Sequence, residues 1–179
     1  MPLLMLKDLP QYECLLKAAE RHPTLDPTAC EAFLHLLRTG DMVFADILHF
    51  LNRHNISQGR FTVLMLLHRP WVESSTPASL SEESGVTRAT MTGLVDTLEK
   101  DGMVVREADA HDRRAVHIRL TEQGHACLDA MLPDYFQCVS RIVNPLNERE
   151  RKELVRLLQK LQEGLTPSPL QPSTQPAEA

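Results

Sequence analysis

Side chains suited to contact with DNA are concentrated between residues 87 and 100 of this 179-residue chain. Arg88 can reach a guanine edge or a phosphate, and small or hydroxyl-bearing neighbours allow a helix to lie deep in a major groove. The positive end of the helix dipole near Thr87 also favours contact with a phosphate. The candidates on this segment are Thr87, Arg88, Ala89, Thr90, Thr92, Gly93 and Lys100.

A second group of candidates, Asp112, Arg113 and Arg114, lies in a short charged loop. An arginine on a thin loop can enter the minor groove of DNA, where the electrostatic potential is most negative. Asp112 can hold one guanidinium in position through a charge-assisted hydrogen bond. The net charge of the chain is −5, so a DNA-binding face must concentrate its positive charge, and we expect Arg113, Arg114 and Arg119 to supply it.

The helix that carries Arg88 is predicted from its cap and from its apolar spacing. Thr87 caps its first turn, and Asp101–Gly102 ends it. Apolar residues at i, i+3, i+4 and i+7 form the face that anchors the helix to the core: Met91, Leu94, Val95 and Leu98. Arg88 and its small neighbours are left on the opposite, exposed side.

The elements on either side of this helix have a recognisable order. A short helix over 77–84 precedes it, across the turn 85–87. Two segments with alternating apolar residues, 103–107 and 115–120, follow it and are predicted to form a hairpin. Two short helices and a hairpin in this order predict a winged helix-turn-helix centred on residues 76–120, in which the hairpin is the wing.

The rest of the chain is predicted to be helical, so the expected fold class is mainly α with a small β-hairpin (α+β). Helices are expected over 8–21, 27–52 and 58–68, from the cap Thr121 onward, and over 147–163. The helix over 27–52 is roughly 40 Å long at 1.5 Å per residue, and its own domain cannot cover it alone. A partner chain is therefore expected.

Composition excludes several classes of protein. Hydrophobic residues make up 42% and charged residues 24%, as in soluble globular domains. No apolar run reaches the roughly 18 residues of a membrane helix, and the first residues do not form a secretion signal. The four cysteines are widely spaced, which favours reduced thiols in the cytoplasm. With seven glycines, no nucleophile elbow, no phosphate loop and no paired carboxylates, neither an enzyme nor a cofactor site is expected.

Three segments together resemble the MarR family of bacterial regulators. They are Val86-Thr-Arg-Ala-Thr-Met-Thr-Gly-Leu-Val-Asp-Thr-Leu-Glu-Lys-Asp-Gly102, Asp112-Arg-Arg114 and Leu120-Thr-Glu-Gln-Gly124. The resemblance spans residues 30–163 and is strongest over 76–125. It implies that Thr87, Arg88, Thr90 and Thr92 lie near bases or phosphates, and that Asp112 and Arg114 form the Asp-x-Arg pair of the wing. Gly93 departs from the family, which often has an arginine at this position.

The resemblance also implies a homodimer in which interlocking N- and C-terminal helices hold two winged lobes on a near-palindromic double-stranded DNA operator, with repression as the outcome. Residues 1–56 and 121–164 are accordingly assigned to a dimerisation region and 57–120 to the winged helix-turn-helix. Residues 165–179, which include four prolines, are expected to be a disordered tail. The segment 1–27 is longer than is usual in the family and is a candidate for a further layer of the dimer.

Many family members bind a small aromatic or anionic effector between the dimer helices and the winged lobe, and are released from DNA by it. The residues that could line such a cleft here are His49, Phe61, Met65, His68 and Tyr135. Each of them is also compatible with an ordinary core position. Carboxylate-binding members often carry an arginine at the position of Thr62, which weakens the case for an aromatic acid.

Three further functions remain open at the level of sequence. Cys30 lies near the position of the reactive cysteine in peroxide-responsive members, which suggests redox sensing, although a free cysteine is more often inert. His111, Asp112 and His117 are close in sequence, but their spacing is not that of a strong zinc motif and no metal site is expected. A winged helix can also serve as a protein-interaction module.

Overall fold

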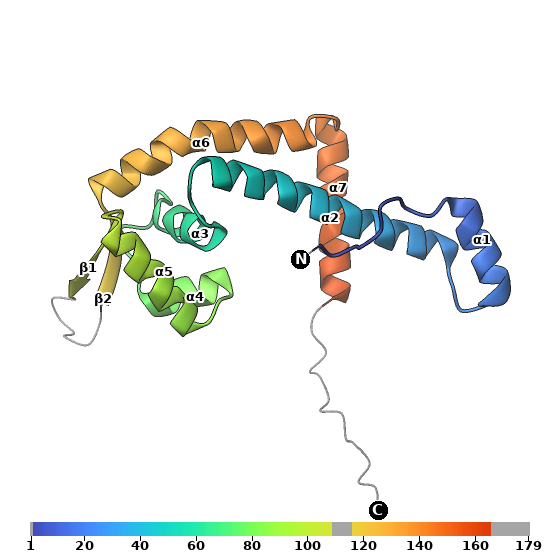
Figure 1. Ribbon diagram of the computed structural model, residues 1–179, viewed down its shortest axis with the longest axis horizontal. Helices are drawn as coiled ribbons and strands as arrows, with labels where there is room; N and C mark the ends of the chain where they lie inside the picture. The colour runs from blue at the N-terminus through green and yellow to red at the C-terminus, as the bar shows by residue number, and fades with distance from the viewer. Residues whose placement is uncertain (1, 109–115, 166–179) are drawn as a thin grey trace, which may run out of the picture. The chain divides into compact units, whose positions relative to one another are not determined.

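The computed structural model describes residues 2–108 and 116–165 (Figure 1). The chain divides into two compact units, Met1–Cys138 and Val139–Ala179. The helices that lie wholly in the first unit are α1 (Tyr12–Arg21), α2 (Pro27–Arg53), α3 (Gln58–Leu67), α4 (Pro77–Ser84) and α5 (Arg88–Lys100). The remaining elements are β1 (Val104–Ala108), β2 (Val116–Leu120), α6 (Glu122–Val143), which crosses the boundary between the units, and α7 (Glu148–Gly164).

Polar side chains fix the starts of most helices where the sequence predicts them. The expected caps accept backbone N–H groups of the first turn, as N-caps do: Asp26, Ser57, Thr76, Thr87 and Thr121. The predicted start of the first helix at residue 8 is wrong, because α1 begins at Tyr12. Pro10 disfavours the helical conformation of the residue before it, and the side chain of Gln11 makes no cap.

The hairpin is antiparallel, and its register places Val104 opposite Leu120 and Arg106 opposite Ile118. Ser75 extends it as an isolated bridge, since its N–H donates to the Ile118 carbonyl (3.0 Å) and its carbonyl accepts the Ile118 N–H (2.7 Å). The segment that leads into α4 is therefore hydrogen-bonded to β2. This contact ties the first helix of the helix-turn-helix to the wing.

The main hydrophobic core is built from residues between positions 50 and 131. It combines side chains of α2, α3, α4, α5, the hairpin and α6: Phe50, Leu51, Ile56, Phe61, Val63, Leu64, Leu67, Leu80, Met91, Val95, Leu98, Val104, Ile118, Leu128 and Met131. Full burial of each such large side chain contributes about 1.5–3 kcal/mol. The winged lobe therefore shares one core with parts of α2 and α6, and its helices α3, α4 and α5 lie near one end of α2 (Figure 1).

The N-terminal segment is attached to α2 by two side chains. The carboxylate of Asp41 accepts the N–H groups of Leu3 (2.6 Å) and Leu4 (2.9 Å). The hydrogen bond from Leu3 is the largest cause that lowers the pKa of Asp41. The guanidinium of Arg38 donates to the carbonyls of Leu6 and Lys7. Residues 3–7 thus lie along α2.

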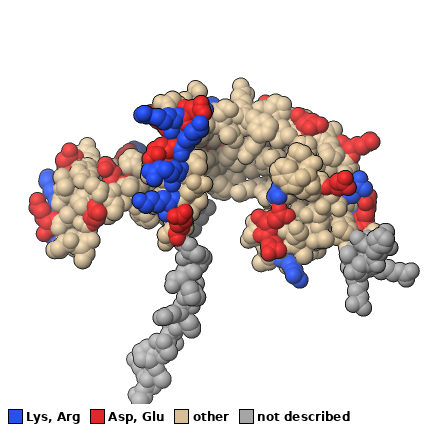
Figure 2. All heavy atoms as spheres, turned by 180° about the vertical axis from the view of Figure 1, so that it is seen from behind, with Lys and Arg blue, Asp and Glu red and all other residues tan. Residues whose placement is uncertain are grey.

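The second unit contains α7, which begins with a capping box. Asn147 accepts the N–H of Glu150, and the Glu150 side chain accepts the N–H of Asn147. None of the described residues of α7 is buried. Figure 2 shows Lys and Arg side chains along one side of α7, among them Arg149, Lys152 and Arg156. The leucines of α7 lie on another side of the helix.

The expectation of a mainly helical fold with a two-stranded hairpin is confirmed. In the described part of the chain, no helix is long and apolar enough to cross a membrane. The wing tip and the C-terminal tail, for which a charged loop and disorder were expected, lie outside the described residues.

Candidate nucleic-acid interface

A glycine turn joins the two helices of the helix-turn-helix. Gly85 ends α4 with φ +69°, in the left-handed region that favours glycine. The N–H of Val86 donates to the Ser81 carbonyl (3.2 Å), which satisfies a carbonyl group at the end of the helix. Thr87 then caps α5 by accepting the N–H of Thr90. The tight turn fixes the angle between α4 and α5.

The inner face of α5 anchors it in the core. Met91, Val95 and Leu98 have no exposed surface, as their spacing predicts. Leu94 packs against Gly59 of α3, where a Cβ atom would lie 2.9 Å from Leu94 Cδ2. α3 and α5 therefore approach more closely at Gly59 than a larger residue would allow.

The outer face of α5 carries all the candidate DNA contacts that were placed on this helix. The following residues are exposed: Thr87, Arg88, Ala89, Thr90, Thr92, Gly93 and Lys100. The Thr92 hydroxyl donates to the Arg88 carbonyl (3.0 Å), and its oxygen keeps a lone pair for another donor. A Cβ atom at Gly93 would meet nothing within 4 Å. The middle of this face therefore has no bulky side chain at Gly93 and is open to solvent.

Positive charge on this face lies at its two ends. Arg88 and Lys100 are separated by the length of α5, which is roughly 18 Å at 1.5 Å per residue. Within residues 2–108 and 116–165, neither side chain has an ion-pair partner. Both remain available for phosphate groups.

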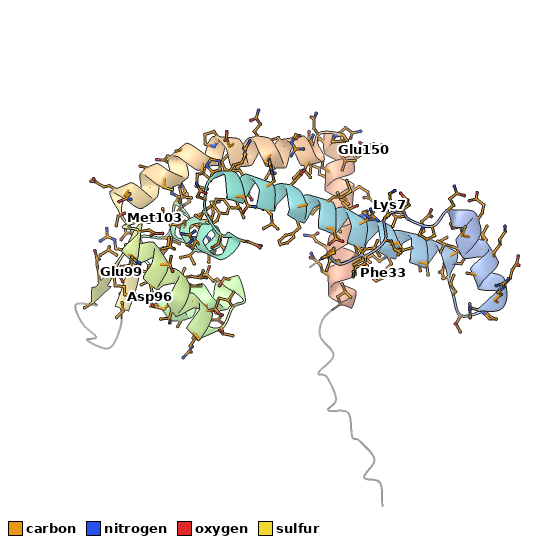
Figure 3. All side chains as sticks on the ribbon, viewed as in Figure 1. Lys7, Phe33, Asp96, Glu99, Met103 and Glu150 are labelled. Carbon is orange, nitrogen blue, oxygen red and sulfur yellow. The ribbon has the colours of Figure 1, made fainter. Side chains whose placement is uncertain are left out.

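Arg106 of β1 ties the wing to α5. Its guanidinium donates to Asp96 Oδ1 (2.6 Å) and to Glu99 Oε2, and Asp96 and Glu99 lie on neighbouring turns of α5 (Figure 3). Partial burial lowers the pKa of Arg106, but the hydrogen bonds and charges of the two carboxylates outweigh burial and raise it. This contact was not predicted from the sequence. The strand alternation could have indicated it, because it places Arg106 on the same side as the buried Val104.

The charge of the wing is partly neutralised. Arg119 pairs with Glu107 across the hairpin (3.1 Å), so the free positive charge expected at Arg119 is compensated. The other three wing candidates, Asp112, Arg113 and Arg114, lie outside the described residues. Their role stays a prediction.

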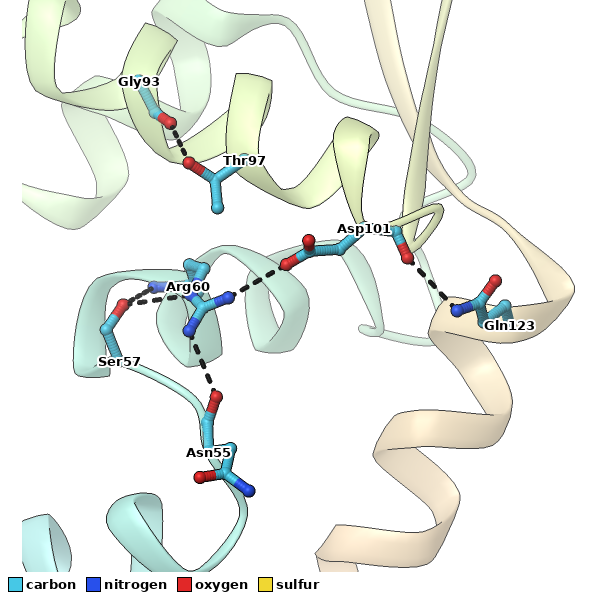
Figure 4. Close-up of polar contacts among 7 residues, drawn as sticks. All are labelled: Asn55, Ser57, Arg60, Gly93, Thr97, Asp101 and Gln123. Carbon is cyan, nitrogen blue, oxygen red and sulfur yellow. Dashed lines mark hydrogen bonds and ion pairs between the residues drawn. The ribbon is translucent and has the colours of Figure 1, made fainter.

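A second cluster of polar contacts holds the C-terminal end of α5 (Figure 4). Arg60 of α3 donates to Asp101 Oδ2 (3.0 Å) and to the Asn55 carbonyl (3.1 Å). Gln123 of α6 donates to the Asp101 carbonyl (3.1 Å). α3 and α6 therefore both hold Asp101, the residue that directly follows α5. None of these partners was identified from the sequence, because they are separated by up to 41 positions.

A cavity of about 500 Å³ lies beside α3. Its walls come from α2, α3, the loop after α3, and α6: Ile47, Leu51, Gln58, Phe61, Thr62, Met65, Leu66, Arg69, Trp71 and Tyr135. Three of the five residues expected in an effector cleft line it, namely Phe61, Met65 and Tyr135. His49 lies elsewhere, since Ile47 and Leu51 are one turn apart and His49 falls on the other side of α2. His68 packs instead against His125 of α6 (ring centroids 5.6 Å).

The residue suggested for redox sensing, Cys30, lies on α2, and one of those suggested for metal binding, His117, lies on β2. Cys30 is a half-buried free thiol in the first turn of α2. Among residues 2–108 and 116–165, no three His, Cys, Asp or Glu side chains form a group that could hold a metal ion. His111 and Asp112 lie outside these ranges.

Comparisons with known proteins agree with this geometry. The sequence model described as the MarR family matches residues 56–116. Over 161 residues the chain is 34% identical to the HTH-type transcriptional repressor YetL of Bacillus subtilis, and the match covers 90% of this chain and 96% of that protein.

Solved structures show the same fold. Sco3205, a MarR family transcriptional regulator from Streptomyces coelicolor solved in complex with DNA, has a TM-score of 0.68 at 23% identity, and its match covers 76% of this chain and 90% of its own. Bordetella bronchiseptica BpsR, whose DNA binding is regulated by 6-hydroxynicotinic acid, has a TM-score of 0.62 at 23% identity. Its match covers 74% of this chain and 98% of its own.

Proposed function

This chain belongs to the MarR family of DNA-binding transcriptional regulators, and from this premise we propose that it is a homodimeric repressor of a near-palindromic operator. It is a regulator and not an enzyme. The observation that carries the proposal is the exposed outer face of α5, where small and hydroxyl-bearing residues lie between two cations that have no ion-pair partner among the described residues. The named repressor YetL, which resembles the chain over most of its length, supports repression.

On this proposal α5 enters the major groove with its N-terminal end foremost. Arg88 contacts a guanine edge or a phosphate, and Lys100 contacts a phosphate at the other end of the helix. Thr90 and Thr92 offer hydroxyl groups to base edges. The open space around Gly93 allows the helix axis to lie close to the bases.

The wing supplies the second contact. Because Arg106 bonds to two carboxylates of α5, the hairpin and the recognition helix have a fixed relative position. Asp112, Arg113 and Arg114 at the tip are proposed to reach the adjacent minor groove. Arg119 contributes less than the sequence suggests, since Glu107 neutralises it.

A second copy of the chain is proposed to cover the large apolar side chains that each unit leaves exposed. In the first unit Met5, Phe33 and Met42 are 78%, 58% and 64% exposed. In the second unit Leu157 and Leu161 of α7 are 44% and 51% exposed. Exposed apolar groups of this size mark interaction surfaces. They fall within residues 1–56 and 121–164, the proposed dimerisation region, in which the hydrogen bonds of Asp41 hold Leu3 and Leu4 against α2.

Release by a small effector is proposed to act through the cavity beside α3. Its volume of about 500 Å³ suits a small aromatic molecule, and Phe61, Met65 and Tyr135 offer ring and sulfur contacts. BpsR, which has the same fold, is regulated by an aromatic acid. The cavity borders α3, which packs against the recognition helix at Gly59, so a ligand there can shift the position of α5.

The proposal is tested by DNA binding of the full chain. Duplexes that the wild-type protein selects from a random pool are expected to share a two-fold symmetric motif, and affinity is expected to fall steeply with salt. Arg88→Ala is expected to lower affinity by about 1–3 kcal/mol and to relax specificity at one position of each half-site. Arg21→Ala, which removes an exposed arginine at the end of α1, is the matched control.

Two results would contradict this proposal. One is a protein that enriches no sequence and binds duplex DNA without salt dependence. The other is equal operator affinity for Arg88→Ala and Arg21→Ala. Either result would instead favour a winged helix that contacts protein and not DNA.

A further inference from the structure

The hydroxyl protons in the middle of α5 are already used inside the helix. Thr92 Oγ1 donates to the Arg88 carbonyl (3.0 Å), and Thr97 Oγ1 donates to the Gly93 carbonyl (2.8 Å; Figure 4). Threonine in a helix commonly bonds to the carbonyl one turn earlier in this way. Each oxygen keeps its lone pairs, because a hydroxyl has one donor and two acceptor sites. Towards DNA, each of these side chains therefore offers an acceptor and a methyl group, and no donor.

The rest of this stretch adds no donor. Residues 91–99, all of which the structure describes, include no Lys, Arg, His, Asn, Gln, Ser, Tyr or Trp. Its two acidic side chains, Asp96 and Glu99, can only accept, and both accept hydrogen bonds from Arg106. The middle of the outer face of α5 thus consists of acceptors and methyl groups, with the free cations confined to the two ends of the helix.

A face of this kind distinguishes the base edges of the major groove. Donors are found there only on adenine N6 and cytosine N4, whereas guanine presents two acceptors. A methyl group is found only on thymine, where it forms an apolar contact with a protein methyl group. An A·T pair is therefore the one pair that offers both a donor and a methyl group.

Thr92 is the residue of this stretch that is best placed to read such a pair. It is exposed, and it precedes Gly93, where a Cβ atom would meet nothing within 4 Å. The hydroxyl and methyl groups of a threonine are carried on Cβ, so they reach a base only where the helix lies close to it. Gly93 allows this approach. Ala89, three positions before Thr92 on the same face, adds a second methyl group.

We propose that Thr92 makes each half-site selective for an A·T pair. Its oxygen accepts a hydrogen bond from adenine N6, and its methyl group contacts the thymine methyl. To bond to guanine, the hydroxyl would have to release the Arg88 carbonyl, and one lost hydrogen bond lowers an equilibrium constant by about 2- to 12-fold. The inference rests on the proposed function, because it names the base pair that the recognition helix selects at its centre.

Base analogues in the operator test this contact with the full chain. The probe is the duplex that the wild type selects from a random pool, synthesised with one analogue at a time. Purine in place of adenine removes the N6 amino group, and uracil in place of thymine removes the methyl group. We expect one A·T pair in each half-site at which purine lowers affinity about 2- to 12-fold and uracil lowers it about fourfold. The same analogues at the other A·T pairs are the internal comparison.

Two variants of Thr92 separate the two contacts. Thr92→Val keeps the methyl group and removes the acceptor, so it is expected to lose the effect of purine and to keep the effect of uracil. Thr92→Ser keeps the acceptor and removes the methyl group, so the reverse is expected. Thr28→Val is the matched control. Thr28 is also exposed and also donates within its own helix start, to Asp26 (2.7 Å), but it lies in α2. It is expected to keep both effects.

Three results overturn the inference: no pair of the half-site that is sensitive to both analogues, a purine effect that survives Thr92→Val, or a uracil effect that survives Thr92→Ser. Binding of the unmodified duplex is measured in the same preparations at two salt concentrations. If the wild type selects a motif and binds it with salt dependence, but the analogue effects ignore Thr92, this inference alone fails. If the wild type selects no motif, the proposed function is rejected and this inference with it.

Discussion

A substitution at Gly93 is expected to change the stability of the recognition helix and its affinity for DNA in opposite directions. Glycine in a helix interior costs about 0.5–1 kcal/mol relative to alanine, and a Cβ here meets nothing in the free protein. We predict that Gly93→Ala raises the free energy of unfolding by about this amount. Operator affinity is expected to fall, because the added methyl group lies on the face that enters the groove. Urea unfolding and DNA titration measure the two effects.

Gly164→Ala is the matched control for this variant. A Cβ atom at Gly164 would also meet nothing within 4 Å, but Gly164 is the last residue of α7 and lies far in sequence from α5. It is expected to leave operator affinity unchanged. If Gly93→Ala binds the operator as well as Gly164→Ala does, the close approach of α5 at this point is refuted.

At Gly124, in contrast to Gly93, there is no space for a larger side chain. A Cβ atom here would lie 2.1 Å from the carbonyl oxygen of Met103, which is backbone and cannot move aside cheaply. We predict that Gly124→Ala lowers the free energy of unfolding by about 1–3 kcal/mol, as overpacking does. Denaturant unfolding checks it. A loss below about 0.5 kcal/mol, the range of neutral surface changes, would show that the start of α6 can shift away from Met103.

At the scale of elements, the contact between β1 and α5 can be tested by whether operator affinity rises or falls when its carboxylates are neutralised. Asp96→Asn with Glu99→Gln removes two negative charges next to the DNA-binding face. If these carboxylates act only through their charge, operator affinity rises. If they hold the wing through Arg106, affinity falls, and we predict the fall.

The same contact can be broken from the other side. Arg106→Gln is expected to weaken operator binding and to cost about 1 kcal/mol or less of stability, because ion pairs near the surface contribute little. Combining it with the double carboxylate variant should add little further loss, since all three residues act through one contact. Independent, additive losses in the binding titrations would contradict this role.

Local elements could be predicted from the sequence, and the contacts between them could not. Thr76 and Thr87 indicate the helices that follow them, because a cap acts within three residues of itself. The outer face of α5 follows directly from the spacing of its buried residues. The pairing of Arg106 with two carboxylates of α5 depends on hairpin register and on how β1 packs against that helix. The pairing of Arg60 with Asp101 spans 41 positions, which a periodic pattern does not encode.

The cavity is an intermediate case. Phe61 and Met65 share one face of α3 by their spacing, so their proximity could be predicted. His49 and His68 were chosen for their chemistry, and neither lies on the faces of α2 and α3 that line the cavity. Arg69 was overlooked because it follows the end of the helix. Its ion pair joins it to Glu83, fourteen positions away on α4.

For the whole molecule, the proposed dimer leads to a prediction about α7. Its exposed leucines and its exposed valine lie on different sides of the helix. Leu154, Leu157 and Leu161 recur at three- and four-residue spacing and form one stripe, whereas Val155 lies off it. Leu157 and Val155 are 44% and 53% exposed within the chain itself, so neither substitution disturbs the fold of one copy. Only a partner chain can distinguish them.

Leu157→Glu is therefore expected to shift the equilibrium from dimer to monomer, and Val155→Glu is expected not to. An unpaired carboxylate in an apolar interface costs about 2 kcal/mol or more, and two-fold symmetry applies this cost twice. Sedimentation equilibrium over a range of protein concentrations measures the change. The monomer should lose its preference for two half-sites on one duplex while it keeps salt-dependent binding through α5. Equal dimerisation of the two variants would remove the leucine stripe of α7 from the interface, and the exposed apolar groups of the first unit would then have to account for the dimer on their own.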